Sequence, residues 1–371
     1  MSASAQEYAT KVLVYRLGSL GDTVIALPAL HLVARAFSQA ERRMLTNLPV
    51  NVKAPAAAAV LENTGLIHGY FRYTVRTRGV LDILKLWWQL RRWKPDVLVY
   101  AAASRGIPAA RRDALFFRLC GIRRLVGVPL TDDMQRQRFE AGLSQGGTLE
   151  SEACRLVRNL SVLGESRFDD PASWSLHLTP SEHARAAEVL RPAEGHRLIA
   201  VSVGTKVQAK DWGRENWRAL LARVAELYPE YAVALCGAPG ESEASEFAAQ
   251  GWREFSSSPV INLCGILSPR ESAAVFARAV VFLGPDSGPM HLAASVQTTC
   301  VAIFAARNMP RVWYPWGDDH RVIRHKVDCE GCNLETCTVQ NKKCLTSISV
   351  DEVLVQLVGV MPEPSGLVEM R

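Results

Sequence analysis

Short apolar runs alternate with stretches of helical periodicity along most of the chain. The first run covers residues 11–15, and after a polar turn a helical pattern extends from Thr23 to about Phe37. A strand followed by a helix, repeated, is typical of a parallel sheet covered by helices. Further strands are expected at 50–53, 69–73, 97–102 and 125–127, and helices at 81–92, 109–120 and 149–164.

The same pattern starts again after the polar, proline-containing segment 165–180. Strands are expected at 198–202, 232–236, 260–263, 280–283 and 299–304, with helices at 214–227, 270–279 and 289–295. We therefore predict an α/β fold with two Rossmann-like halves, whose ligands bind at the carboxyl ends of the strands. The expected domains are 1–180 and 181–348, with a final helical segment, 349–371, that returns to the N-terminal domain.

Composition agrees with two globular domains. The chain has 371 residues, of which 48% are hydrophobic and 22% charged, and this length exceeds what one average core organises. No run reaches the ~20 apolar residues of a membrane span. The N-terminal residues lack the basic flank and apolar core of a signal peptide. We expect a cytoplasmic protein.

Positive charge is concentrated between Arg72 and Arg138, although the net charge is only +6. Such a region is either a solvated surface balanced by acids elsewhere or a binding surface for an anionic acceptor, a membrane or nucleic acid. We see no zinc finger, homeodomain-like helix or aromatic platform, so nucleic acid is not an expected partner. Segment 86–93 carries aromatic and basic residues that suit a bilayer surface, such as the cytoplasmic face of the inner membrane, unless Trp87 and Trp93 belong to the core.

Two turns carry candidate chemistry. Residues 281–294 combine a strand, a small polar turn and a helix start, which favours anion binding by free backbone N–H groups. An ordinary connection with Asp286 or Ser287 as the helix cap is the alternative. In the first turn, Gly18 to Asp22 reads G-x-x-G-D, which disfavours a dinucleotide fingerprint. Asp22 at the head of a helix can cap it, and can also accept a proton.

These two turns carry a resemblance to a known family. Residues 12–30 and residues 286–294 resemble the N-terminal and C-terminal motifs of glycosyltransferase family 9, the heptosyltransferases. The resemblance extends through Lys210 to Trp212 and Glu215 to Trp217. It implies a GT-B fold with two facing domains, and inverting, metal-independent sugar transfer. It also implies a nucleotide-diphosphate sugar donor, with ADP-heptose favoured, an anionic saccharide or glycolipid acceptor, and no cofactor.

The resemblance also assigns roles to individual residues. Asp22 matches the general base and Lys210 the lysine that contacts the donor phosphates, which makes these two the expected catalytic residues. Further donor contacts are expected at Thr205 for a phosphate, Glu241 for the ribose, Leu267 for the base, and Asp286, Ser287, Gly288 and His291 for the diphosphate. His291 either approaches the diphosphate or simply packs.

On the acceptor side the sequence departs from the family. Residues 100–106 lack the acidic or glycine-rich turn that many members carry, which leaves the acceptor's identity open. Arg76, Arg78 and Arg105 are the expected acceptor-binding residues, because arginine forks recognise phosphates and carboxylates.

Nine cysteines are present, and four of them cluster at positions 329, 332, 337 and 344. Four thiolates can surround a tetrahedral metal ion, but this spacing is not that of two regular zinc knuckles. A structural metal, a disulfide and free thiols in a packed loop all stay open, and the expected active site uses no metal.

The sequence thus predicts an inverting glycosyltransferase that moves a sugar, with heptose favoured, to a lipopolysaccharide core or a related bacterial saccharide. One alternative keeps the fold but changes donor and acceptor. A nucleotide-sugar epimerase would need a second acid/base pair in the donor domain, and none is evident. A non-catalytic scaffold would tolerate the loss of Asp22.

Overall fold

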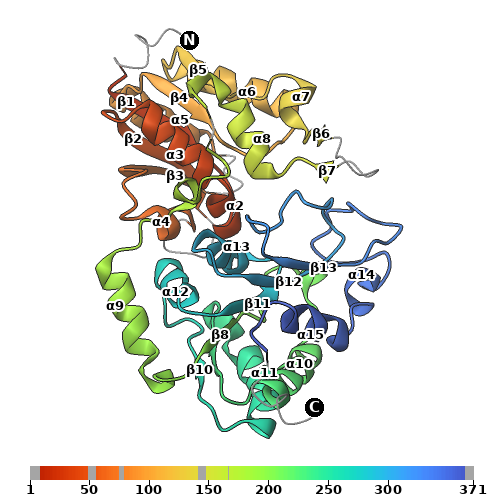
Figure 1. The fold of residues 1–371 in the computed structure, drawn as a ribbon. Helices are drawn as coiled ribbons and strands as arrows, with labels where there is room; N and C mark the ends of the chain where they lie inside the picture. Colours follow the sequence, from red (N-terminus) through yellow and green to blue (C-terminus); the bar gives the residue numbers. More distant parts are fainter. Residues whose placement is uncertain (1–8, 49–55, 75–78, 141–147, 166, 364–371) are drawn as a thin grey trace. The chain divides into compact units, whose positions relative to one another are not determined.

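The computed structural model describes residues 9–48, 56–74, 79–140, 148–165 and 167–363. The chain divides into two compact units, 1–177 and 178–371 (Figure 1). The boundary falls inside the segment that was expected to link two domains. Each unit is a parallel sheet with helices, as the sequence predicts. Among the described residues, no helix is long and apolar enough to cross a membrane.

Unit 1 contains a five-stranded parallel sheet in the order β3-β2-β1-β4-β5. The central strand β1 pairs with β2 through Leu13 opposite Arg43, and with β4 through Leu13 opposite Leu98. The strands are β1 (Lys11–Tyr15), β2 (Glu41–Leu48), β3 (Gly69–Thr74), β4 (Val97–Tyr100) and β5 (Arg124–Val126).

Strand β2 was not predicted, and the expected strand 50–53 lies outside the described residues. The reason is Arg42, a charged residue that is buried in this strand. Its guanidinium donates hydrogen bonds to the carbonyls of Phe37, Leu66 and Gly65 at 2.8 to 3.0 Å. A buried charge is tolerated when its donors are satisfied, and these acceptors come from neighbouring turns.

The helices of unit 1 largely follow the predicted pattern. They are α2 (Leu20–Ile25), α3 (Leu27–Ala36), α4 (Ala56–Leu61), α5 (Val80–Trp93), α6 (Ile107–Leu119), α7 (Asp132–Gln135) and α8 (Glu152–Asn159). A small antiparallel pair, β6 (Phe139–Glu140) and β7 (Thr148–Leu149), precedes α8. The helix expected from Thr23 is two helices, because Pro28 suits the first turn of a new helix.

Helices α5 and α6 cover the same face of the unit 1 sheet. Leu90 of α5 and Phe117 of α6 belong to one buried cluster with Leu13 and Tyr15 of β1. The two helices also touch each other, since the Trp87 indole donates a hydrogen bond to the Leu119 carbonyl at 3.0 Å. Trp93 is buried in this cluster, as the core interpretation predicts, whereas Trp87 only packs against it.

Unit 2 contains a six-stranded parallel sheet in the order β10-β9-β8-β11-β12-β13. Its first five strands repeat the order found in unit 1. The strands are β8 (Leu198–Val201), β9 (Ala232–Leu235), β10 (Val260–Asn262), β11 (Val281–Pro285), β12 (Cys300–Phe304) and β13 (Arg321–Arg324). The helices are α9 (Pro180–Val189), α10 (Arg214–Leu227), α11 (Ser242–Phe255), α12 (Pro269–Phe276), α13 (Gly288–Ser295), α14 (Lys343–Thr346) and α15 (Val350–Val358).

The C-terminal helix α15 belongs to the core of unit 2. Its Val353 and Leu357 are buried in one cluster with Trp217 of α10 and Val301 of β12. Just before the helix, the Ile348 carbonyl accepts a hydrogen bond from the Trp212 indole at 3.1 Å. This corrects the expectation that segment 349–371 returns to the N-terminal domain, because the apolar face of α15 is buried in the core of unit 2.

Candidate functional site

Asp22 lies in the first turn of α2, immediately after β1. Its carboxylate oxygen Oδ2 accepts hydrogen bonds from the backbone N–H and the hydroxyl of Ser19, at 2.6 and 2.7 Å. Ser19 is the N-cap of the helix, so Asp22 caps it from the third position rather than from the first. These contacts fix one oxygen, while the side chain stays 25% exposed. The Asp22 carboxylate therefore caps helix α2 and can still be reached by a ligand.

Beneath Asp22 lies Arg16, a buried arginine that the sequence analysis did not single out. Its guanidinium donates hydrogen bonds to the Asp22 carbonyl and, at 2.7 Å, to the Ala101 carbonyl after β4. It also lies 4.0 Å from the second carboxylate oxygen of Asp22. Burial lowers the pKa of Arg16, against the opposing effect of Asp22. Arg16 thus ties the turn that carries Asp22 to the neighbouring strand end.

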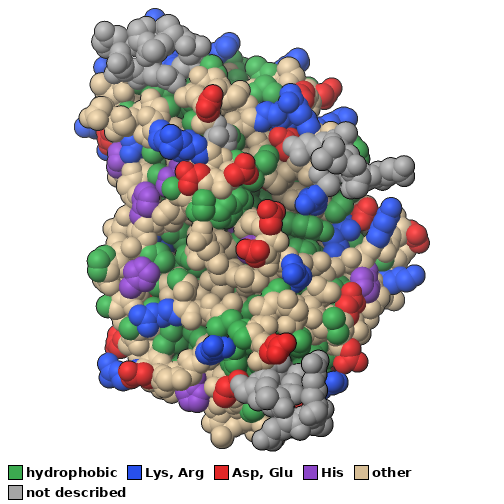
Figure 2. All heavy atoms as spheres, viewed as in Figure 1, with side chains coloured by type: hydrophobic (Ala, Val, Ile, Leu, Met, Phe, Trp, Pro, Cys, Tyr) green, Lys and Arg blue, Asp and Glu red, His purple; other side chains and the backbone are tan. Residues whose placement is uncertain are grey.

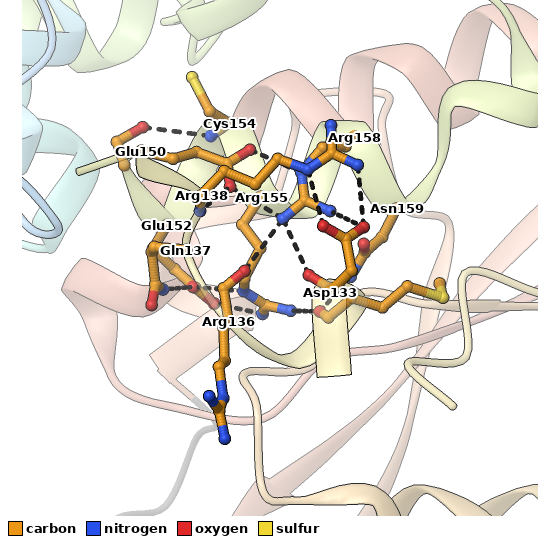
Figure 3. A network of polar contacts seen from close by, with 12 residues as sticks. Asp133, Arg136, Gln137, Arg138, Glu150, Glu152, Cys154, Arg155, Arg158 and Asn159 are labelled. Atoms are coloured by element: carbon orange, nitrogen blue, oxygen red, sulfur yellow. Dashed lines mark hydrogen bonds and ion pairs between the residues drawn. The ribbon is translucent and has the colours of Figure 1, made fainter. Parts of the chain in front are cut away.

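A polar network braces the other side of this strand end (Figure 3). Arg155 of α8 is fully buried, forms a two-point ion pair with Glu152 at 2.7 and 2.8 Å, and donates to the Ala102 carbonyl. Arg158 bridges Glu150 and Asp133 at 2.8 and 3.0 Å. These arginines are structural, because their charges are neutralised within unit 1.

Arg105 is the one expected acceptor residue that the structure describes, since Arg76 and Arg78 lie within 75–78, outside the described residues. Its guanidinium donates to the hydroxyls of Tyr15 and Tyr100 at 3.0 and 3.1 Å, and forms an ion pair with Asp113. Burial raises the pKa of Tyr100 to about 12, so this phenol stays protonated. Arg105 is thus anchored at the carboxyl edge of the sheet, and a third of its side chain is exposed.

In unit 2, Lys210 and Asp286 meet at the carboxyl edge of the sheet. The ammonium of Lys210 lies 2.7 Å from the Asp286 carboxylate and 3.2 Å from the Asp286 carbonyl. Lys210 follows β8 in sequence, and Asp286 directly follows β11, the neighbouring strand. The ion pair is 16% exposed at the lysine and 4% at the aspartate. The structure therefore brings together two residues that the sequence placed in one site.

Ser287 and Gly288 form the start of α13 beside this pair. Ser287 is the N-cap, as one sequence alternative predicts. Its hydroxyl is buried and, within the described part of the chain, has no hydrogen-bond partner. The Ser202 hydroxyl after β8, which the sequence analysis missed, is in the same state. Unsatisfied buried hydroxyls are costly and are common where a ligand supplies the partner. His291, one turn further, is buried.

Glu241 lies against the loops that follow β8 and β9. A methyl group on Gly204 would come within 2.1 Å of its carboxyl carbon, and one on Gly237 within 2.4 Å of its oxygen Oε2. The same oxygen accepts a hydrogen bond from the Ala238 N–H at 2.7 Å. The two glycines thus leave the space that Glu241 occupies.

The two remaining expected donor residues are less constrained. The Thr205 hydroxyl accepts a hydrogen bond from the Val207 N–H at 3.3 Å. Leu267 is half-buried just before Ser268, the N-cap of α12. A cavity of about 630 Å³ also occurs in unit 2, but it lies at the start of β8 beside Arg191 and Arg278. None of the expected site residues lines it.

The four clustered cysteines are spread over sixteen residues of the sequence, and all four line one small cavity of about 20 Å³. All four are free thiols. Hydrogen bonds from the backbone N–H groups of Gln340, Lys342 and Val339 lower the pKa of Cys337. Among the described residues, no group of three or more His, Cys, Asp or Glu is placed to hold a metal ion. The thiols therefore pack together without a bond between them.

Comparison with known proteins identifies the family. The model of glycosyltransferase family 9 (heptosyltransferase) matches residues 150–343, more than half of the chain. The chain belongs to glycosyltransferase family 9. The sequence-based resemblance is confirmed, and the matched range contains Lys210, Glu241 and Asp286.

Curated relatives of this family 9 chain include two heptosyltransferases. Lipooligosaccharide heptosyltransferase 2 of Campylobacter jejuni is 30% identical over 98 residues, which are 26% of this chain and 30% of the relative. Lipopolysaccharide heptosyltransferase 3 of Escherichia coli is 26% identical over 173 residues, 43% of this chain and 47% of the relative. The matches thus span about a third to a half of these relatives.

Solved structures confirm the GT-B-type α/β fold of the family 9 chain. A family 9 glycosyltransferase from Veillonella parvula has a TM-score of 0.71 at 17% identity, covering 95% of this chain and 98% of that one. E. coli ADP-heptose lps heptosyltransferase II has a TM-score of 0.65 at 17% identity, with the same coverage. At this identity the likeness concerns the fold.

Proposed function

We propose that the chain is an inverting glycosyltransferase that moves a heptose from ADP-heptose to a hydroxyl of a lipopolysaccharide core or a related bacterial saccharide. The observation that carries the proposal is the Lys210–Asp286 ion pair at the start of α13, inside the range that matches the family model. Family membership favours a transferase over the epimerase alternative. The name of one structural relative, an ADP-heptose lps heptosyltransferase, supports the choice of donor and acceptor.

Unit 2 would hold the donor. After its contacts with the Asp286 carboxylate and carbonyl, the Lys210 ammonium has one N–H donor left, which would contact the diphosphate as its negative charge grows during departure. The Ser287 hydroxyl and the free N–H groups of α13 would bind its oxygens. Glu241 would accept hydrogen bonds from the ribose hydroxyls.

Unit 1 would activate the acceptor. Ser19 occupies oxygen Oδ2 of Asp22, which leaves Oδ1 to take the proton of the acceptor hydroxyl. As that oxygen bonds to the anomeric carbon, the bond from this carbon to the diphosphate breaks, and attack from the opposite side inverts the configuration. Arg105 would bind an anionic group of the acceptor. With Lys210 supplying the positive charge, we expect transfer to persist in the presence of EDTA.

The test separates donor binding from transfer. Replacement of Asp22 by Asn removes the base, so we expect the transfer rate to fall by ~10²- to 10⁴-fold. Calorimetric binding of ADP-heptose should be unchanged, because the donor contacts lie in unit 2. Thermal shifts should be larger with ADP-linked than with UDP- or GDP-linked sugars. Asp132→Asn, an exposed carboxylate of the same unit, is the control.

Full transfer by Asp22→Asn would overturn the assignment of the base. The absence of a thermal shift with every nucleotide sugar would overturn the donor site, whatever the transfer assay shows.

A further inference from the structure

Large apolar side chains are exposed on α5 and α6, the two helices that lie together on one face of the unit 1 sheet. Leu81 and Trp88 of α5 are 82% and 54% exposed, and Leu115 and Leu119 of α6 are 60% and 59% exposed. The opposite side of each helix is buried, at Leu90 and at Phe117. Single exposed leucines are ordinary, but a group of them on two touching helices indicates an interaction surface.

Exposed cations are interspersed with these apolar residues. Lys85 and Arg92 recur on the same side of α5 as Leu81 and Trp88, at helical spacing, and Arg111 and Arg118 do so beside Leu115 on α6. The Arg92 guanidinium stacks on the Trp88 ring at 5.2 Å from its centre. We call the surface formed by Leu81, Lys85, Trp88, Arg111, Leu115 and Arg118 the α5–α6 face.

Across the described part of the chain, Lys85, Arg111 and Arg118 of this face form no ion pair. The two helices contain only Asp82 and Asp113, and Asp113 is buried in its ion pair with Arg105. Arg138 and Arg158, in contrast, are paired with Asp133 and Glu150. On the surface drawn in Figure 2, basic and acidic side chains likewise lie among one another. The α5–α6 face therefore suits an anionic partner that also accepts apolar side chains.

We propose that the α5–α6 face docks on the anionic surface of a phospholipid bilayer. Arginine and lysine bind lipid phosphates, while leucine and tryptophan enter the boundary between headgroups and acyl chains. A second copy of the chain is a poor occupant, because a symmetric contact through this face would place cations against cations.

The orientation of α5 adds a functional reason, which rests on the proposed function. In a parallel sheet, a helix that follows a strand begins at the carboxyl edge of the sheet, and α5 follows β3. Leu81, near the start of α5, thus lies toward the edge that carries Asp22 and Arg105. A bilayer bound to this face would place a lipid-anchored acceptor hydroxyl near the carboxyl edge of the unit 1 sheet, where Asp22 lies.

The experiment is co-sedimentation of the full chain with vesicles, without donor or acceptor. We expect binding to phosphatidylcholine vesicles that contain phosphatidylglycerol, weaker binding to phosphatidylcholine alone, and release by salt. The triple variant Lys85→Gln, Arg111→Gln, Arg118→Gln should lower the affinity roughly 100-fold. The triple variant Leu81→Gln, Trp88→Gln, Leu115→Gln should lower it about tenfold or more.

Matched controls carry the same changes at exposed positions elsewhere. Arg191→Gln, Arg278→Gln and Arg321→Gln remove three cations from unit 2, and Val162→Gln, Phe255→Gln and Val355→Gln remove three exposed apolar side chains. Both should bind vesicles like the unaltered chain. All replaced side chains are exposed, so circular dichroism should show every variant folded.

Equal binding by the face variants and the controls, or no binding to the anionic vesicles, would overturn the proposal. Self-association that the face variants abolish would assign the face to a second copy instead. The proposed function would fail separately if the unaltered chain bound vesicles but bound no nucleotide sugar. If both hold, the face variants should lose transfer to a vesicle-embedded acceptor and keep transfer to a detergent-solubilised one.

Discussion

Single glycines set how closely the site loops approach the acidic side chains. Gly18 has a φ of 134°, and a methyl group there would lie 2.4 Å from the β-carbon of Asp22. Gly204 has an ordinary backbone, so a side chain there would act only through its overlap with Glu241. Position 204 therefore offers a clean steric test of the Glu241 assignment.

Replacement of Gly204 by Ala should push Glu241 away from the loop after β8. If Glu241 binds the ribose, calorimetry should show that ADP binds about tenfold more weakly or worse, which corresponds to one lost charge-assisted hydrogen bond of ~1.5 kcal/mol. Gly240→Ala is the control, because a methyl group there meets no atom within 4 Å. Unchanged ADP affinity in Gly204→Ala would argue against the ribose role.

At the scale of elements, one ion pair joins helices α9 and α12. The Arg270 guanidinium contacts both carboxylate oxygens of Glu182, at 2.5 and 2.9 Å, and both side chains are largely buried. Glu182 also accepts a hydrogen bond from the N–H of Thr179, the N-cap of α9. Burial raises the pKa of Glu182, but hydrogen bonds from Arg270 and Thr179 more than offset this, so its pKa lies below the ordinary value.

This pair predicts a stability difference that depends on pH. The pKa of Glu182 is lower in the folded than in the unfolded chain, so its contribution is present above the ordinary glutamate pKa and is lost as the pH falls through the folded-state pKa. Glu182→Gln should lower the free energy of unfolding by ~1–3 kcal/mol at neutral pH. Urea unfolding at several pH values should show this difference shrinking in acid. Glu188→Gln, on the exposed side of α9 where water screens the ion pair with Arg185, should show a much smaller difference at every pH.

At the scale of the whole molecule, each unit has a core of its own. Trp252 and Trp217 are fully buried in the cluster that covers the unit 2 sheet, and Phe117 and Leu90 in the cluster of unit 1. Strands pair only within a unit across the described residues. The burial that stabilises one sheet is therefore separate from the burial that stabilises the other.

Core variants should consequently act on one unit at a time. Trp252→Ala should destabilise unit 2 by ~3–5 kcal/mol, because it removes a large buried side chain. Hydrogen exchange followed by mass spectrometry should show faster exchange in peptides of unit 2 and unchanged exchange in peptides of unit 1. Phe117→Ala should give the reverse pattern. Loss of protection in both units from either variant would contradict independent cores.

Much of the fold could be predicted from the sequence, and the failures have identifiable causes. Strands β1, β8 and β12 and helix α10 were found nearly to the residue, because apolar periodicity directly reflects burial. Strand β2 was missed because Arg42 breaks its apolar pattern. Helix α15 was assigned to the other unit because periodicity shows that a face is buried, but not against what.

The candidate site divides in the same way. Its motifs placed Asp22 and Asp286 in strand-to-helix turns and Lys210 in the loop after a strand, since a strand, a turn and a helix start are local features of the chain. Arg16 and the unsatisfied hydroxyls of Ser202 and Ser287 were missed, because their state depends on groups distant in sequence, such as the Ala101 carbonyl.

The sequence by itself determined the alternation of strands and helices in two α/β units, and the family, since each follows from local periodicity or from contiguous motifs. Only the tertiary structure decided which charges are neutralised and which are exposed. Arg105 pairs with Asp113 of α6, whereas Lys85, Arg111 and Arg118 of the α5–α6 face are exposed and form no ion pair with another described residue. The physical reason is that a charge is neutralised by whatever the fold brings within a few ångströms, and sequence distance does not fix that.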